Sequence, residues 1–178
     1  FYAIIGGVEK AIQIASLVLC HSRMIYFQFY PRFRRFECKL FLTDAVHYFG
    51  GVCARCMIDN THVIVLRGTG KDMVPVPEML AFGERLGGFK FAAHEKGDAN
   101  RSARVEGGFG FIQGNFFKGR KFTDWDHLNR EALIWCDKVN ASFSRKLHAS
   151  RRELFAAERL RLKLLPAWVP PVYQLHQR

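Results

Sequence analysis

Residues 52–60 are the stretch that most restricts how this chain folds. Apolar side chains occupy both sides of the alternation from Val52 to Ile58, and the run ends in Asp59. This pattern predicts a central strand covered on both faces. An acid directly after such a strand lies where open α/β sheets bind ligands. The pair Asp59-Asn60 is also ordinary turn composition, and the turn is the simpler explanation of the local pattern.

The elements predicted around this strand alternate in type. A hairpin at Gly6-Gly7 and two strands at 12–20 and 24–30 come first, and a helix at 36–49 follows. The helix stripe is Cys38, Phe41, Leu42, Ala45 and Phe49, and it closes at Gly50-Gly51. Downstream of residue 60 we expect a short strand at 63–66, a helix starting at Pro77 and a strand at 89–94.

Three further helices are predicted in the second half of the chain. The first carries the stripe Val105, Phe109, Ile112 and Phe116; the others open at caps Thr123 and Ser150, the last running to about Lys163. The order predicts an α/β fold with a mixed sheet flanked by helices. A ribonuclease-H-like fold has this order if one more strand precedes Phe1. We therefore divide the chain into a core at 1–122, a helical extension at 123–165 and the start of a C-terminal region at 166–178.

Glu106 is the second acid that could carry chemistry. It lies beside the apolar stripe of its predicted helix, at the border between core and surface, where its carboxylate can point towards Asp59. Converging carboxylates repel each other unless a divalent cation lies between them, as Mg²⁺ does in phosphoryl transfer. The alternative is a solvated surface glutamate.

The charge of the chain favours a polyanionic partner. It carries 27 Lys and Arg against 16 Asp and Glu, a formal net charge of +11, which is typical of nucleic-acid binding. One cluster flanks the Glu106 helix: Lys96, Arg101, Arg104, Lys118, Arg120 and Lys121. Another lies in the C-terminal third: Arg145, Lys146, Arg151, Arg152, Arg159, Arg161 and Lys163. A solvated helix face is the alternative, but few acids balance these residues, which favours phosphate contacts.

Other motifs point away from metal-knuckle, nucleotide and membrane functions. Cys53 and Cys56 have knuckle spacing, but residues three apart on a strand face opposite ways. The run from Gly68 to Lys71 lacks the first glycine and the hydroxyl residue of a phosphate-binding loop. The apolar run at 11–20 is too short to span a bilayer. Five cysteines, an odd number, favour reduced thiols and a cytoplasmic location.

Several segments in order resemble one family. They are Ser22-Arg-Met-Ile-Tyr26, Phe33-Arg-Arg-Phe-Glu-Cys-Lys39, Met57-Ile-Asp-Asn-Thr-His62 and Gly97-Asp-Ala-Asn-Arg-Ser-Ala-Arg-Val-Glu106, followed by 125–140 and the helix containing Arg151-Arg-Glu-Leu154. Together they resemble the integrase-type catalytic core of IstA-type insertion-sequence transposases, over essentially the whole chain.

The resemblance implies a ribonuclease-H-like fold and an Asp-Asp-Glu triad that binds two Mg²⁺ or Mn²⁺ ions. It also implies strand transfer of transposon ends into target DNA by a homo-oligomer on DNA, with an AAA+ ATPase helper of the IstB type, at the nucleoid. Asp59 matches the second Asp of the triad, and Glu106, 47 positions later, matches its Glu.

The chain departs from the family pattern in two places. The first Asp of the triad belongs on a strand before Phe1, so we expect the chain to begin inside a longer protein and not to join DNA alone. Glu106 is followed by Gly107-Gly108, where the family has a pair such as Arg-Pro. Two helix glycines cost ~1–2 kcal/mol relative to Ala. An inactive remnant that only binds DNA is therefore the alternative to a transposase core.

Overall fold

The computed structural model describes residues 1–59, 61–93 and 109–173. Helices and small sheets are both present, so the predicted α/β class is confirmed. The chain divides into two compact units. We call Phe1–Phe33 with the described part of 106–160 the hairpin unit, and the described parts of 34–105 and 161–178 the parallel unit. The predicted domain boundaries at 122/123 and 165/166 stay a prediction.

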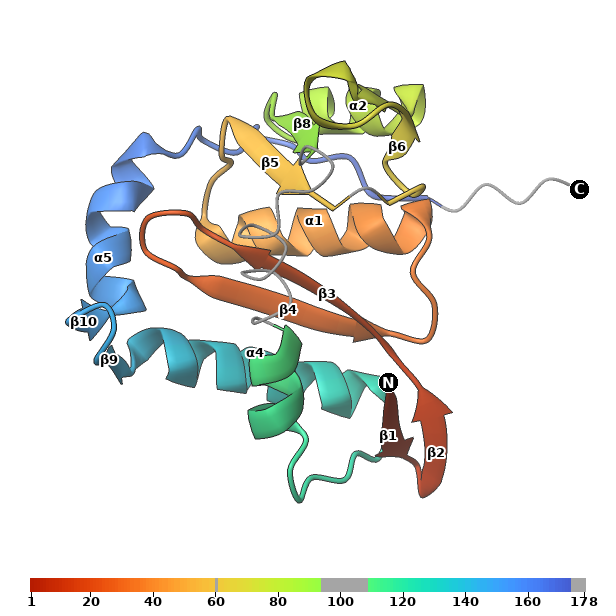
Figure 1. Cartoon of the computed structure of the whole chain (residues 1–178), viewed down its shortest axis with the longest axis vertical. Helices are drawn as coiled ribbons and strands as arrows, with labels where there is room; N and C mark the ends of the chain where they lie inside the picture. The colour runs from red at the N-terminus through yellow and green to blue at the C-terminus, as the bar shows by residue number, and fades with distance from the viewer. Residues whose placement is uncertain (60, 94–108, 174–178) are drawn as a thin grey trace, which may run out of the picture. The chain divides into compact units, whose positions relative to one another are not determined.

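The hairpin unit opens with two antiparallel hairpins (Figure 1). The first joins β1 (Tyr2–Ile5) to β2 (Val8–Ala11) through Gly6 and Gly7, whose φ angles of 62° and 77° suit residues without a side chain. The second joins β3 (Gln13–Val18) to β4 (Ile25–Tyr30), in register from Gln13↔Tyr30 to Val18↔Ile25. Both hairpins were predicted, and both predictions are confirmed.

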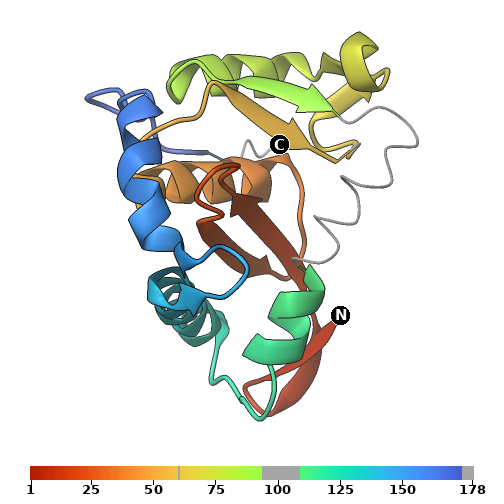
Figure 2. The ribbon, with the colours of Figure 1, turned by 60° about the vertical axis from the view of Figure 1, so that its left-hand side comes forward.

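Helices complete the hairpin unit. Residues 109–116 are helical, and they are followed by α4 (Trp125–Ala141) and α5 (Arg151–Glu158). A short hairpin of β9 (Phe143–Ser144) and β10 (Ala149–Ser150) joins α4 to α5 (Figure 2), and a 3-10 turn at Arg159–Arg161 follows. The α4 cap is Asp124, which accepts the His127 N–H at 2.7 Å, so the predicted cap Thr123 is wrong by one residue. Helix α5 ends at Glu158, earlier than the predicted Lys163.

Aromatic rings form the core of the hairpin unit. The Phe27 ring of β4 lies 5.4 Å from Trp135 on α4 and 5.7 Å from Phe116, centroid to centroid. Phe29 and Phe122 each stack on Phe116, at 5.4 Å and 5.7 Å. Such pairs contribute about 0.5–1.5 kcal/mol each beyond their buried area. Of the predicted stripe, Ile112 and Phe116 are buried and Phe109 is half-buried, while Val105 lies outside the described residues.

Two asparagines of α4 bond to the outer edge of β4. The Asn140 side chain accepts the Ile25 N–H at 3.0 Å and donates to the Ile25 carbonyl at 2.8 Å. Asn129 makes the same pair of bonds to Phe29, at 2.8 Å and 3.0 Å. Each side-chain amide therefore replaces one residue of a neighbouring strand and satisfies backbone groups that would otherwise be lost on burial.

The parallel unit is built around the pair β5 and β8. Strand β5 (Arg55–Ile58) runs parallel to β8 (Lys90–Ala93), with Arg55 opposite Lys90 and Ile58 opposite Ala93. The remaining elements are α1 (Arg35–Phe49), β6 (Val65–Arg67), the 3-10 turn Gly70–Asp72, β7 (Val74–Pro75) and α2 (Pro77–Arg85). Within the described ranges no helix is long and apolar enough to cross a membrane.

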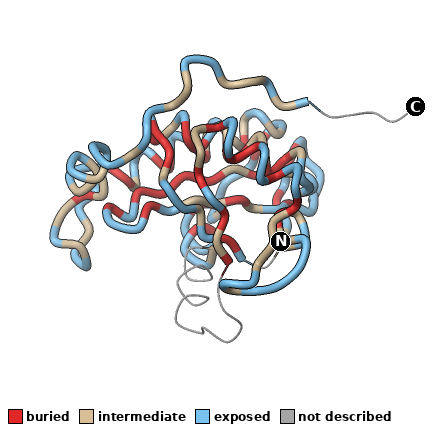
Figure 3. Tube along the Cα trace, turned by 90° about the horizontal axis from the view of Figure 1, so that it is seen from above, coloured by how far each residue is buried: buried red, intermediate tan, exposed pale blue. Residues whose placement is uncertain are grey.

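Helix α1 agrees with its predicted pattern. All five residues of the predicted stripe are buried, and Gly50 ends the helix with φ of 68°. Helix α2 begins at Pro77 as predicted. In Figure 3 buried residues alternate with exposed ones along the trace, as expected for helices and strands with one inward face.

The prediction for 52–58 is correct in type but wrong in extent and burial. Strand β5 begins at Arg55, and Arg55 and Met57 are exposed, so this strand is not covered on both faces. Val52 instead forms two 2.9 Å backbone bonds with Lys163, whose Nζ donates to the Gly88 carbonyl at 2.8 Å. A segment 111 positions away thus binds the start of the predicted strand, and alternation alone carries no such information.

Candidate functional site

Asp59 lies where the sequence analysis expected it, directly after β5. Because β5 and β8 are parallel and Ile58 pairs with Ala93, the carboxyl ends of both strands meet at one edge. Asp59 is exposed, and its carbonyl accepts the Thr61 N–H at 2.6 Å. The residue is therefore both an acid at a strand end and part of a turn, so the two interpretations of the sequence are compatible.

Four predicted site residues lie outside the described ranges. They are Lys96, Arg101, Arg104 and Glu106. The chain enters this part of the sequence from Ala93, the residue that pairs with Ile58. The predicted approach of Glu106 to Asp59 therefore stays a prediction.

The ligand chemistry of Asp59 fits a hard divalent cation. Carboxylate oxygen is the donor that Mg²⁺ and Mn²⁺ prefer. Among the residues that the structure describes, no group of three His, Cys, Asp or Glu side chains could hold a metal ion. A metal site at this edge therefore needs a further acid from outside the described residues, and Glu106 is the predicted one.

The other predicted DNA contacts form one exposed turn of the hairpin unit, which we call the basic turn (118–121). Buried Phe116 and Phe122 anchor its two sides, and Phe122 bonds to β1 through the Gly6 N–H and the Ile4 carbonyl. Lys118, Arg120 and Lys121 are all exposed. The turn therefore presents three cationic side chains to solvent between two anchored ends.

Arg120 differs from the two lysines of the basic turn. Its Nη1 lies 2.8 Å from a Glu131 carboxylate oxygen, and its guanidinium lies 5.0 Å from the centre of the Phe116 ring. These contacts within the chain fix the orientation of the Arg120 guanidinium. We therefore expect Lys118 and Lys121 to be the stronger phosphate ligands of this turn.

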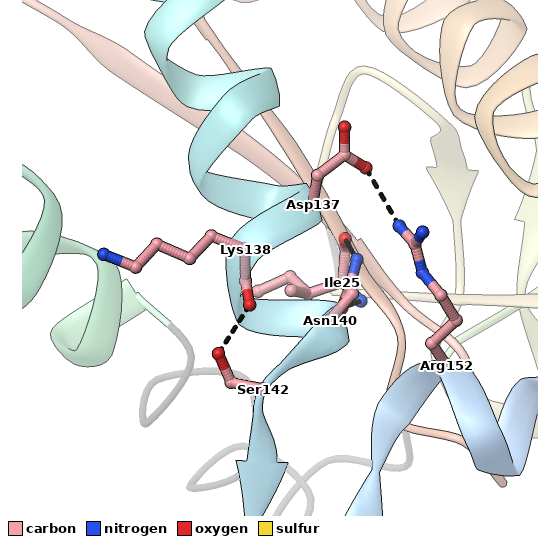
Figure 4. A network of polar contacts seen from close by, with 6 residues as sticks. All are labelled: Ile25, Asp137, Lys138, Asn140, Ser142 and Arg152. Carbon is pink, nitrogen blue, oxygen red and sulfur yellow. Dashed lines mark hydrogen bonds and ion pairs between the residues drawn. The ribbon is translucent and has the colours of Figure 1, made fainter.

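A second basic region surrounds the β9–β10 hairpin. The ion pair between Arg152 and Asp137, at 3.4 Å, links α5 to α4, and the Ser142 hydroxyl donates to the Lys138 carbonyl at 2.6 Å (Figure 4). Ser150 is buried and accepts the Glu153 N–H at 3.1 Å. The predicted capping box of α5 is thereby confirmed.

Three cysteines have thiols of low reactivity. Burial raises the pKa of Cys38, Cys56 and Cys136 to about 12 in each case. Neighbouring thiols add to the effect, Cys56 on Cys38 and Cys53 on Cys56. A thiol with so high a pKa is a poor nucleophile and a poor metal ligand near neutral pH.

Pattern reasoning missed Asn129 and Asn140 as structural residues. Asn140 is fully buried and lies on the same helix face as Trp135 and Cys136. A polar residue within a buried stripe needs hydrogen-bond partners. This rule would have predicted from the sequence that Asn140 makes buried hydrogen bonds. It would not have identified Ile25 as the partner.

No family model matches this chain, and no curated protein matches it in sequence.

Proposed function

We propose that this chain is the catalytic core, in part, of a DNA transposase of the IstA type with a ribonuclease-H-like fold. Its reaction is phosphoryl transfer that joins transposon ends to target DNA. The observation that carries the proposal is the position of Asp59 at the carboxyl edge of the parallel pair β5–β8. Ligand sites of open α/β sheets lie at such edges. The predicted order of motifs and the charge of +11 support the same function.

In this proposal Asp59 and Glu106 are the acids of the site. Bound Mg²⁺ or Mn²⁺ supplies activation of the attacking oxygen and stabilisation of the leaving oxygen. Lys118 and Lys121, with Lys96, Arg101 and Arg104, bind the DNA backbone, and Arg120 supports the basic turn. The partners are transposon ends and target DNA, a homo-oligomer on DNA and an AAA+ helper of the IstB type, at the nucleoid.

DNA binding is tested first with the chain itself. We expect binding to duplex DNA with weak sequence preference and a log–log salt slope of several units. Replacing Lys118 and Lys121 by Gln should lower that slope by roughly two, because each lost phosphate contact removes about one unit. A flat salt titration, or no binding at low salt, would contradict the proposal.

The chemistry is tested with a longer protein that contains this chain and the expected first Asp. Strand transfer of pre-cleaved transposon ends is compared with and without Asp59→Asn. Loss of transfer together with retained DNA binding is expected, since the substitution removes a carboxylate and changes little else. Transfer that persists in Asp59→Asn would remove Asp59 from the site. DNA binding with no transfer in the unaltered protein would support the DNA-binding remnant.

A further inference from the structure

The β9–β10 hairpin has an unbalanced positive tip. The four residues between its strands are Arg145, Lys146, Leu147 and His148, and Arg145, Lys146 and His148 are exposed. Within the described ranges neither Arg145 nor Lys146 has an ion-pair partner. The tip contains no acid. It therefore presents two permanent cations to solvent.

The acids closest in sequence already have partners within the hairpin unit. Asp137 pairs with Arg152. Glu153 accepts the Ser150 N–H at 2.6 Å, and this bond keeps the pKa of Glu153 below its usual value. Glu158 accepts two backbone N–H groups of the β3–β4 turn, from His21 and Ser22, each at 3.0 Å. Each of these carboxylates is thus held by other groups, and the tip cations are left for an external anion.

The hairpin is also held in one conformation. The Leu147 N–H donates to the Ser144 carbonyl at 3.1 Å, and His148 has φ of 54°, a left-handed geometry that closes the turn. The Arg152–Asp137 pair links the two flanking helices (Figure 4). The side chain of Ser150 caps the second of them, α5. A fixed binding element loses less conformational freedom when it binds.

We propose that the β9–β10 hairpin is a preformed contact to the phosphate backbone of duplex DNA, additional to the basic turn and to the predicted acid site. A two-stranded ribbon is an element that the ~12 Å major groove admits, and cations at its tip reach phosphates of the groove walls. This inference rests on the proposed function only in taking DNA as the partner of the chain.

The test uses the whole chain and a fluorescent 20-base-pair duplex of random sequence, titrated at several salt concentrations. The variant Arg145→Gln/Lys146→Gln removes the two tip cations. We expect its affinity at low salt to fall at least tenfold and its log–log slope to fall by roughly two units, since each phosphate contact contributes about one. The matched control Arg85→Gln/Lys90→Gln removes the same number of positive charges, at exposed positions of the parallel unit. This control is expected to keep the log–log slope of the unaltered chain.

The possible outcomes separate the two claims. An unaltered slope in the hairpin variant, with normal binding by the unaltered chain, overturns the hairpin contact and leaves the proposed function standing. Equal loss in both variants also overturns it, because net charge alone would explain the effect. Competition by polyglutamate as strong as that by duplex DNA would indicate an acidic protein as partner and overturn it too. Unchanged urea midpoints in both variants establish that folding is intact.

Discussion

The two main strand pairs of this molecule are completed in different ways. In the parallel unit, β5 and β8 pair through backbone bonds and α2 lies between them in sequence, the usual order of a parallel crossover. In the hairpin unit, the outer edge of β4 is bonded by side chains of α4, from residues 100 and 115 positions away. Both pairs are held by backbone bonds between their strands, and in the hairpin unit two side-chain amides bond the outer edge of β4 as well.

The difference shows where each unit is vulnerable. Apolar packing tolerates exchange of one aliphatic side chain for another, but a buried backbone N–H and carbonyl need partners with defined geometry. Asn140 supplies both partners to Ile25. We therefore expect that replacing one buried polar side chain of the hairpin unit lowers the free energy of unfolding more than a single substitution in the parallel unit.

The largest effect is expected from Asn140→Ala. The change leaves the Ile25 N–H and carbonyl without partners in a buried site and opens a small cavity, so the free energy of unfolding should fall by about 2–4 kcal/mol. Urea unfolding followed by tryptophan fluorescence measures the loss, and Trp135 reports from the same helix.

Asn129→Ala is the matched variant for this comparison. Asn129 makes the same two bonds but is half-buried, so water can replace its amide and the loss should be about 1–2 kcal/mol. If both alanine variants lose the same small amount, below about 0.5 kcal/mol, the side chains of α4 do not stabilise the edge of β4.

A smaller effect is expected in the parallel unit from Gly51→Ala. A Cβ at this position would lie 2.8 Å from the Leu162 Cβ and 3.0 Å from the Lys163 carbonyl oxygen. Overpacking of this kind costs typically about 1–3 kcal/mol, and here it should loosen the bonds between Lys163 and Val52. Limited proteolysis should then cleave the chain near Lys163 faster.

Gly110→Ala is the control for that variant. Gly110 is helical, and a Cβ there meets no atom within 4 Å. This change should stabilise its helix by roughly 0.5–1 kcal/mol and leave cleavage near Lys163 unaltered. Equal cleavage of the Gly51 and Gly110 variants would show that contact with Val52 does not protect the segment.

The smallest effect concerns Glu78 in the parallel unit. A hydrogen bond from Lys39 is the largest cause that lowers the pKa of Glu78; burial opposes it, and the charges of Lys39 and Arg35 lower the pKa further. A lowered folded-state pKa stabilises the protein above the unfolded value of about 4.5, and this contribution disappears as the pH falls through the folded value.

Because Glu78 is half exposed, the pair should contribute no more than about 0.5 kcal/mol. Urea midpoints of the unaltered chain and of Glu78→Gln should therefore differ slightly at neutral pH and converge in acid. A difference that grows as the pH falls would contradict the direction of the pKa shift.

Much of the secondary structure could be predicted because local rules determined it. The β3–β4 hairpin, the α1 stripe, Pro77 at the start of α2 and the Ser150 capping box follow from spacing and cap chemistry. The extent of β5 could not be predicted, because the partner of Val52 is Lys163, far along the chain. The Thr123 cap failed for a smaller reason: Asp124, the next residue, is an equally good cap.

The candidate site was predictable only in part. The position of Asp59 after a strand followed from alternation and the terminal acid, and the parallel register with β8 places it at a sheet edge. The engagement of Arg120 with Glu131 and Phe116 was not predictable, because neither contact follows from sequence spacing alone. A count of basic residues cannot separate a cation held within the protein from one available to DNA.

Each unit also carries its own buried thiol. Cys136 of the hairpin unit and Cys38 of the parallel unit are almost fully shielded from solvent, and both have a pKa of about 12. Such a thiol reacts with an alkylating reagent only while the surrounding structure is open. Mass spectrometry of peptides from a time course of alkylation would therefore measure the rate of opening of each unit separately. The natural cysteines Cys136 and Cys38 serve as the two probes.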